Sequence, residues 1–441
     1  MNVSIAALIL IIITSGYVMT FVNNANAIAI EVRDQEGRLV ISSLEPTKNS
    51  NLFEPGVWAP PILTANLIFL FLVILNYKKG LPVTIKKSIK FIFEYEVSRK
   101  VALIIVVSLI AIYVIFNVGK IWDSEEESWG DYEKAVSQAK NWSAFSSISL
   151  SLGSDLRIFL LSISLNIFGN IRIIPFIVSI SLLVMTYFLA SELSKKRFAG
   201  IISTVILLQS NLFLRYSVSA TEDNTWTLFY ILSLYLVYKK WFLSPLAYGL
   251  SFLSKPLTAI FLPMTFFFIY TSSLSKKEKT RTALLYITTI LIPVVIAIYL
   301  YRGTSFDPNG FWTGLIAFQI FLRFDGLILV LLLPLAIGLF VASKKGILHA
   351  DSLMILITGI LWSAPLLAGF AEITNQAYRF VPLIVFFAIG FSILFSNNMN
   401  KQLVTKNFVT TLVSLFTIVT AFVSVILVIF PNLIQIIYKL F

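Results

Sequence analysis

The feature that most constrains this chain is a series of apolar segments that runs almost from its first residue to its last. Of its 441 residues, 58% are hydrophobic and 13% are charged, whereas about 25% of a soluble domain is charged. A transmembrane helix needs about 20 apolar residues, and fewer where it is broken or half-inserted. We therefore expect an all-α polytopic membrane protein with about 12 or 13 transmembrane helices. Candidate spans are 4–22, 60–77, 101–121, 172–192, 198–217, 224–239, 243–254, 256–272, 283–301, 326–343, 350–370, 381–396 and 407–430.

The first apolar segment has two interpretations. Ala25-Asn26-Ala27 resembles a signal-peptidase site. However, the first four residues of the chain, MNVS, contain no Lys or Arg, which favours a retained helix. Residues 28–43 then alternate between apolar and polar side chains around a turn, which predicts a small β-hairpin outside the membrane.

Lys and Arg concentrate in every second connection between the predicted spans, at 78–100, 195–197, 239–240, 276–281, 344–345 and 401–406. The positive-inside tendency places these connections in the cytoplasm and the others, including 122–171, on the extracytoplasmic side of a plasma membrane. This alternation requires that residues 155–170 do not cross the bilayer. We expect them to form a juxtamembrane helix at the outer surface. The net charge of +12 is then explained by the cytoplasmic connections, without a nucleic-acid partner.

The composition of the chain disfavours several classes of chemistry. It has no cysteine and a single histidine, His349, so thiol nucleophiles, thiolate metal sites and histidine-based acid–base catalysis are disfavoured. It also has no GxxxxGK[ST] sequence, which argues against a nucleotide-driven pump.

Acidic residues cluster in the stretch 121–142, directly after an apolar segment. Carboxylates at a membrane edge can act as a general base or as ligands of a divalent cation. The ordinary alternative is a solvated acidic turn, and the pattern alone does not decide between them. The acidic residues are Asp123, Glu125, Glu126, Glu127, Asp131 and Glu133.

Three further polar sites interrupt apolar segments on the same predicted side. Glu222 and Asp223 are either a functional acidic pair or part of a helix N-cap. Lys255 precedes a proline that breaks a helical hairpin, and Arg379 lies at the outer end of a span. Either cation can bind a lipid phosphate. For Lys255 taken alone, snorkelling to the headgroups is the favoured role, and Arg379 can also simply anchor its helix.

An ordered set of motifs runs through residues 101–396: DSEEESWGDYEKA, DLRIFLLSISLNIFG, NIRIIPFIV, FLRYSVSATEDNTW, GLSFLSKP and AYRFVP. In this order they resemble the GT-C superfamily of membrane glycosyltransferases, and most closely the dolichyl-phosphate-mannose protein mannosyltransferase and aminoarabinose transferase branch. The resemblance implies transfer of a sugar from a polyprenyl-phosphate donor to a glycan, lipid or protein acceptor on the outer face.

The resemblance also implies residue roles. The catalytic carboxylate would be one of Asp123, Glu125, Glu126 and Asp131, the second acidic element Glu222, Asp223 and Asp155, and the donor-phosphate ligands Lys255 and Arg379. Two departures from the family pattern matter. Ser124 separates Asp123 from Glu125, so no single base is assigned. SDLR at 154–157 replaces a usual His-Pro-Pro. No organic cofactor is implied, and dependence on Mg²⁺ or Mn²⁺ stays open.

We divide the chain into an N-terminal transmembrane hairpin with a basic loop (1–100), a GT-C-like catalytic core (101–396) and a C-terminal transmembrane helix with a short tail (397–441). A secondary transporter or a lipid or polysaccharide flippase is the main alternative. It predicts inverted repeats and charges at mid-bilayer, and neither is clear here. A non-catalytic membrane scaffold is a third interpretation.

Overall fold

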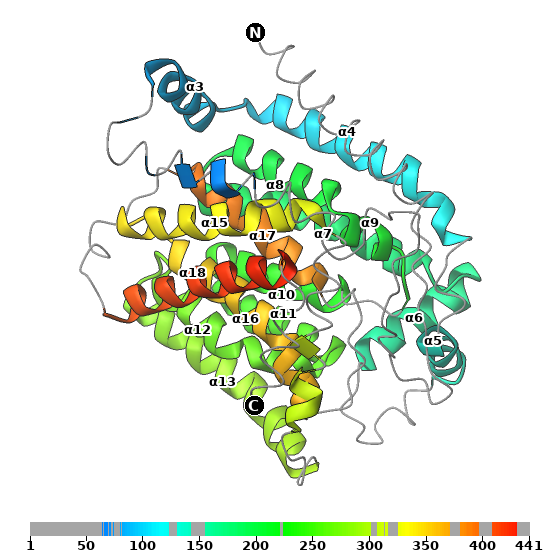
Figure 1. The fold of residues 1–441 in the computed structure, drawn as a ribbon. Helices are drawn as coiled ribbons and strands as arrows, with labels where there is room; N and C mark the ends of the chain where they lie inside the picture. Colours follow the sequence, from blue (N-terminus) through cyan, green and yellow to red (C-terminus); the bar gives the residue numbers. More distant parts are fainter. Residues whose placement is uncertain are drawn as a thin grey trace, which may run out of the picture.

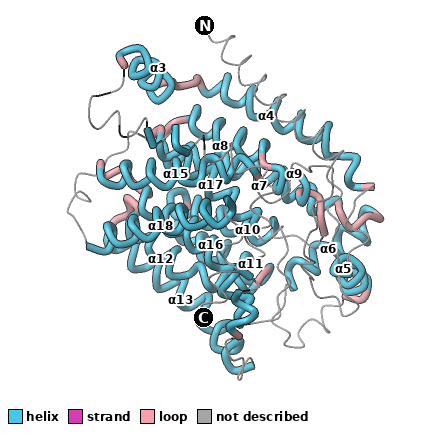
Figure 2. Tube along the Cα trace, viewed as in Figure 1, coloured by secondary structure: helices cyan, strands magenta, loops and turns pink. Residues whose placement is uncertain are grey.

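The computed structural model describes residues 64, 66–68, 70, 71, 74, 80, 82–122, 130–142, 155–220, 224–300, 307–312, 314, 315, 325–370, 380–396 and 408–429. Within these residues all regular elements are helices, as Figures 1 and 2 show. The helical class predicted from the sequence is therefore confirmed for this part of the chain. The predicted first span at 4–22 and the predicted β-hairpin at 28–43 lie outside it.

The helix boundaries follow the apolar segments closely. The span predicted at 101–121 forms α4 and ends in the 3₁₀ helix η1. Two further predicted spans are divided: 198–217 forms α8 and α9, and 256–272 forms the 3₁₀ helix η4 and then α12. The elements are α3 (Val83–Glu94), α4 (Arg99–Asn117), η1 (Val118–Ile121), α5 (Gly130–Lys140), α6 (Asp155–Phe168), α7 (Ile173–Ser194), α8 (Arg197–Gln209), α9 (Asn211–Tyr216), α10 (Asn224–Lys239), η3 (Trp241–Leu243), α11 (Ser244–Ser254), η4 (Pro256–Phe261), α12 (Leu262–Thr271), α13 (Lys276–Leu300), α15 (Gly326–Lys344), α16 (Ala350–Phe370), α17 (Val381–Leu394) and α18 (Phe408–Ile429).

Both divisions have local causes. Between α8 and α9, the Ser210 hydroxyl accepts a hydrogen bond from the Phe213 amide at 3.1 Å, so it caps a new helix rather than continuing the old one. The same hydroxyl donates to the buried carboxylate of Asp325 at 2.5 Å. In the second segment, prolines 256 and 263 occupy the first turns of η4 and α12, where a missing amide costs nothing.

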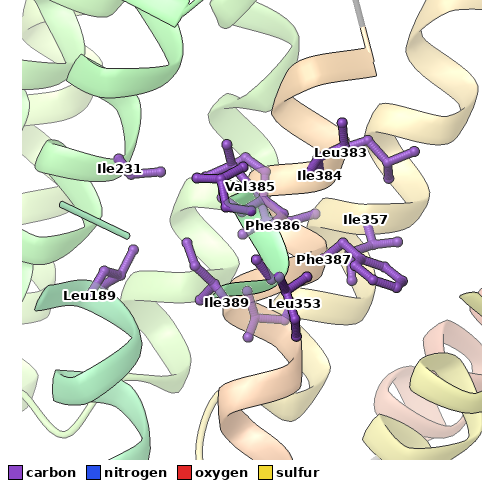
Figure 3. Packing of buried hydrophobic residues seen from close by; sticks show 14 of the residues in the cluster. Leu189, Ile231, Leu353, Ile357, Leu383, Ile384, Val385, Phe386, Phe387 and Ile389 are labelled. Carbon is purple, nitrogen blue, oxygen red and sulfur yellow. The ribbon is translucent and has the colours of Figure 1, made fainter. Parts of the chain in front are cut away.

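The centre of the fold is α17, which packs against α7, α8, α15 and α16. Nearly all of its side chains are buried, including Phe386 and Phe387, as expected for a helix that is apolar around its whole circumference. Figure 3 shows these side chains between Leu189 of α7, Ile231 of α10 and Leu353 of α16. The helices around α17 thus share one apolar core, and the site described below lies away from it.

Contacts between helix ends divide the described helices into two groups. At the basic end, α7 and α10 end together, joined by Glu192 and Lys239 at 2.7 Å, and α8 begins beside the segment before α4, where Arg197 lies 3.8 Å from Glu96. The other end, here called the site end, holds the carboxyl ends of α4, α8 and α11 and the amino ends of α7, α10 and α15. The helices therefore alternate in direction as the distribution of Lys and Arg predicted.

Two described helical segments have the length and apolar composition needed to cross a membrane, Arg99–Ile121 and Ile173–Ser194. Several shorter apolar helices of 10–17 residues accompany them. Residues 155–168 form α6, the helix expected there, and it packs against α5, α7 and α11. The domain boundaries at residues 100 and 396 stay predictions.

Candidate active site

Two described residues of the acidic stretch, Ile121 and Tyr132, contact one buried arginine, Arg172, which is 2% exposed. The carbonyl of Ile121 accepts hydrogen bonds from Arg172 Nη1 at 3.3 Å and from Asn170 Nδ2 at 2.9 Å. The Arg172 guanidinium also lies over the ring of Tyr132 on α5, 4.8 Å from the ring centroid. The two residues, which flank 123–131 in the sequence, are therefore both held by the residue that precedes α7.

The turn between α6 and α7 holds the backbone of Arg172 in place. Gly169, with φ +69°, ends α6 in the left-handed conformation that glycine adopts without strain. The Asn170 side chain then accepts from the Arg172 amide at 2.9 Å, and the Ser164 hydroxyl donates to the Asn170 carbonyl at 2.7 Å. This network fixes the backbone of Arg172 before its side chain reaches the flanks of the acidic stretch.

Helix α5 packs on α6 through a small apolar cluster separate from the main core. Ala135 and Ala139 of α5 are buried against Ile158 and Leu161 of α6, and the rings of Trp142 and Phe159 lie 4.9 Å apart. In Figure 1 these two helices lie side by side at the edge of the molecule, near the carboxyl end of α4. Packing of small residues brings the first turn of α5, with Asp131, close to α6.

A narrow cleft opens between α6, α7 and the start of α10. Arg157 of α6 and Asn224 of α10 both line it, together with Ser219, Ala220 and Thr225. Arg157 Nε and Asn224 Oδ1 are buried, and neither atom has a hydrogen-bond partner among the described residues. A buried polar atom without a partner is costly, so such a pair marks a place where a ligand or water completes the bonding.

The turn that carries Lys255 lies at the same end. The Ser251 hydroxyl in the last turn of α11 donates to the Trp226 carbonyl in the first turn of α10 at 2.7 Å. The amide of Lys255 in turn donates to the Ser251 carbonyl at 3.0 Å. The partly buried Lys255 is therefore fixed beside the helix start that supplies Asn224 to the cleft.

The structure describes only part of the predicted site. Asp131 lies in the first turn of α5, Asp155 is the first residue of α6, and Lys255 is placed as above. In sequence, the second acidic pair separates Ala220 from Asn224, and both of those residues line the cleft. Outside the described residues lie Asp123, Glu125, Glu126, Glu222, Asp223 and Arg379. Among the described residues no group of three or more His, Asp or Glu is placed to hold a metal ion.

Two residues at this end were not singled out from the sequence, Arg172 and Asn224. Arg172 was visible only as the arginine that opens a span, and Asn224 as the residue after an acidic pair. Their importance comes from contacts that no local pattern encodes: Arg172 reaches Ile121 across 51 positions, and Asn224 reaches Ser179 across 45.

A comparison of the sequence with known protein families gives a match to part of the chain. Residues 156–300 match the family model described as dolichyl-phosphate-mannose-protein mannosyltransferase. The resemblance to this GT-C family is thereby confirmed. The matched region holds Arg157, Arg172, Asn224 and Lys255, and leaves out the acidic stretch before it. No curated protein and no solved structure matches the chain.

Proposed function

We propose that this protein is a multi-pass membrane glycosyltransferase that moves a sugar from a polyprenyl-phosphate donor to an acceptor at the extracytoplasmic face. The family match over residues 156–300 supports membrane glycosyltransferase activity, with α6, α7 and the α10–α11 hairpin as the matched framework. The observation that carries the proposal is the gathering of the acidic flanks, the Arg157 cleft and the Lys255 turn at one end of the helices.

The proposed reaction is an in-line displacement at the anomeric carbon. A carboxylate from the set Asp123, Glu125, Glu126 and Asp131 removes the proton of an acceptor hydroxyl, whose oxygen then bonds to the anomeric carbon. The bond from that carbon to the phosphate oxygen breaks, and polyprenyl phosphate leaves. Its charge is stabilised by Lys255 and Arg379, since cations placed where charge develops lower the barrier.

Other chain residues position these groups rather than react. Arg172 holds the two flanks of the acidic stretch, so it limits how far the base can move from the acceptor. Glu222, Asp223 and Asp155 form the second acidic element, which orients the acceptor or shares a divalent cation. The acceptor is a glycan, a lipid or a protein.

The test uses purified protein in detergent with polyprenyl phosphates that carry different sugars. We expect the four variants Asp123→Asn, Glu125→Gln, Glu126→Gln and Asp131→Asn to separate into one that loses about 10²- to 10⁴-fold in transfer rate and three that keep most of it. Donor binding should persist in all four.

Two results would overturn the proposal. One is the absence of transfer from every polyprenyl-phosphate sugar by the unaltered protein together with an extract of acceptors. The other is undiminished transfer by all four variants. Accumulation of donor lipid in sealed vesicles, unaffected by these variants, would indicate a transporter instead.

A further inference from the structure

The amide of Asn224 has a fixed orientation. Asn224 is 2% exposed, and its Nδ2 donates to the Ser179 hydroxyl at 2.9 Å. Ser179 in turn donates its single proton to the Ser217 carbonyl at 2.5 Å, so its oxygen can only accept from Asn224. A flipped amide would bring two acceptors together. Nδ2 therefore faces Ser179, and Oδ1 is the atom left for the cleft.

Two residues that line the cleft, Asn224 and Arg157, have complementary unpartnered atoms. Oδ1 of Asn224 needs a hydrogen-bond donor, and Nε–H of Arg157 needs an acceptor; neither has a partner among the residues that the structure describes. The space between the lining residues admits a group of about the size of a hydroxyl. A hydroxyl group, like a water molecule, can donate through its proton and accept through its oxygen at the same time.

We propose that this cleft is a sugar subsite, in which a hydroxyl of the donor sugar donates to Asn224 Oδ1 and accepts from Arg157 Nε. The proposal rests on the proposed function and adds a specificity-determining residue to it. Asn224 lies on α10 at the helix start to which Ser251 joins the Lys255 turn, so the subsite and that turn belong to the same end of the helices. The cleft then selects among sugars by whether a hydroxyl stands at that ring position.

The experiment measures binding without acceptor, so that catalysis is not needed. Full-length protein in detergent is titrated with bare polyprenyl phosphate and with polyprenyl phosphate carrying mannose, glucose or galactose. The tightest-binding sugar is then compared with its monodeoxy derivatives. We expect one deoxy derivative to bind about tenfold more weakly, because the loss of that hydroxyl leaves both buried cleft atoms unpaired.

The variant Asn224→Leu should bind the full sugar about tenfold more weakly and should no longer distinguish it from that deoxy derivative. Asn117→Leu is the matched control, because Asn117 is also a buried asparagine, 3% exposed, but lies on α4 outside the cleft. It should bind all these lipids as the unaltered protein does.

Failures of the two proposals are distinguishable. If bare polyprenyl phosphate and all three sugar lipids fail to bind, the proposed function fails. If sugar lipids bind and are transferred, but every deoxy derivative binds like its parent or Asn224→Leu keeps the discrimination, the subsite is wrong. In that case the two cleft atoms share a water molecule only.

Discussion

Charged side chains have different partners at the two ends of the described helices. At the basic end Glu192 accepts from Lys195 and from Lys239, and Arg197 lies 3.8 Å from the carboxylate of Glu96, although Lys196 there donates to a main-chain carbonyl. At the site end Arg172 binds a main-chain carbonyl and a ring, and Arg157 Nε has no partner in the part of the chain that the structure describes.

This difference separates two uses of a cation. A charge that is neutralised within the fold stabilises it but has little left to offer a ligand. A cation with a buried donor atom that the fold does not use, such as Arg157, can bind a ligand or stabilise a developing negative charge. We therefore expect substitutions at the site end to change activity at constant stability, and substitutions at the basic end to do the reverse.

The largest effect is expected at Lys255. Lys255→Ala should lower the rate of sugar transfer about 100-fold, because it removes a cation proposed to hold the leaving phosphate. Lys255→Arg keeps the charge and should retain more of the rate than the alanine variant. Initial rates at saturating acceptor measure this, and thermal melting should stay constant. An unaltered rate for Lys255→Ala would show that the Lys255 turn is not part of the site.

Arg172 should have the next largest effect, as a positioning residue. Arg172→Met keeps the length of the side chain but loses the hydrogen bond to Ile121 and the contact with Tyr132. We expect kcat to fall about tenfold with a smaller change in KM for the donor, since the base is less well placed while the phosphate ligands remain. Cleavage after Glu125–Glu127 by a glutamate-specific protease should become faster. Unchanged kcat and unchanged cleavage would show that these two contacts are irrelevant.

At the basic end, Glu192→Gln should lower stability without lowering transfer. The Glu192 side chain is only 18% exposed and faces two lysines, so its loss leaves both cations unpaired and costs about 1–2 kcal/mol. Melting in detergent reports the change. The matched control is Glu94→Gln, which breaks the exposed pair with Lys90 and should leave melting unaltered. If Glu192→Gln melts normally and loses activity, the comparison of the two ends is reversed.

The smallest effect concerns the single histidine, which is buried between α15 and α16 at the basic end. Its Nε2 is hydrogen-bonded to the Tyr238 hydroxyl, and its ring stacks on Phe268 at 4.5 Å. Burial, with a further contribution from the charge of Lys195, lowers the pKa of His349 to about 3. The unfolded chain therefore binds a proton between pH 6.5 and 3 that the folded chain does not, so stability falls as the pH drops below 6.5.

Between pH 7 and pH 5.5 this loss amounts to about 1 kcal/mol. Melting recorded across that range should show it, and His349→Asn should flatten the dependence. Asparagine suits the test because His349 has φ 68°, a left-handed conformation that asparagine tolerates. A pH dependence that persists in the variant would assign it to other groups.

Much of the fold could be predicted because apolar length determines helix length. The segments at 224–239 and 350–370 coincide with α10 and α16, and α6 covers residues 155–168 of the segment predicted to form a juxtamembrane helix. The break at Ser210 could not be predicted, because serine is common inside apolar segments and only the distant Asp325 shows what its hydroxyl binds. The match to residues 156–300 covers the middle of the motif set on which the resemblance rested.

The sequence predicts at which end of the helices the candidate site lies, but not every residue that lines it. Lys255 lies at the expected end beside the start of α10, because a proline after a short helix predicts a turn. Arg172 and Asn224 were missed because their roles depend on contacts between residues far apart in the sequence. The Arg172 guanidinium contacts Ile121 and Tyr132. The Asn224 amide is oriented by Ser179, whose hydroxyl donates to the Ser217 carbonyl. The choice among Asp123, Glu125, Glu126 and Asp131 stays a prediction.

The most direct test of the central claim is a donor labelled with carbon-14 in the sugar and phosphorus-32 in the phosphate, incubated with purified protein and an extract of acceptors. The account predicts that the two labels separate: carbon-14 enters the acceptor, and phosphorus-32 stays in the lipid as polyprenyl phosphate. The variant with Asp123, Glu125, Glu126 and Asp131 all changed to amides should leave the labels together. Labels that stay together with the unaltered protein, or that separate equally with this variant, would contradict the account.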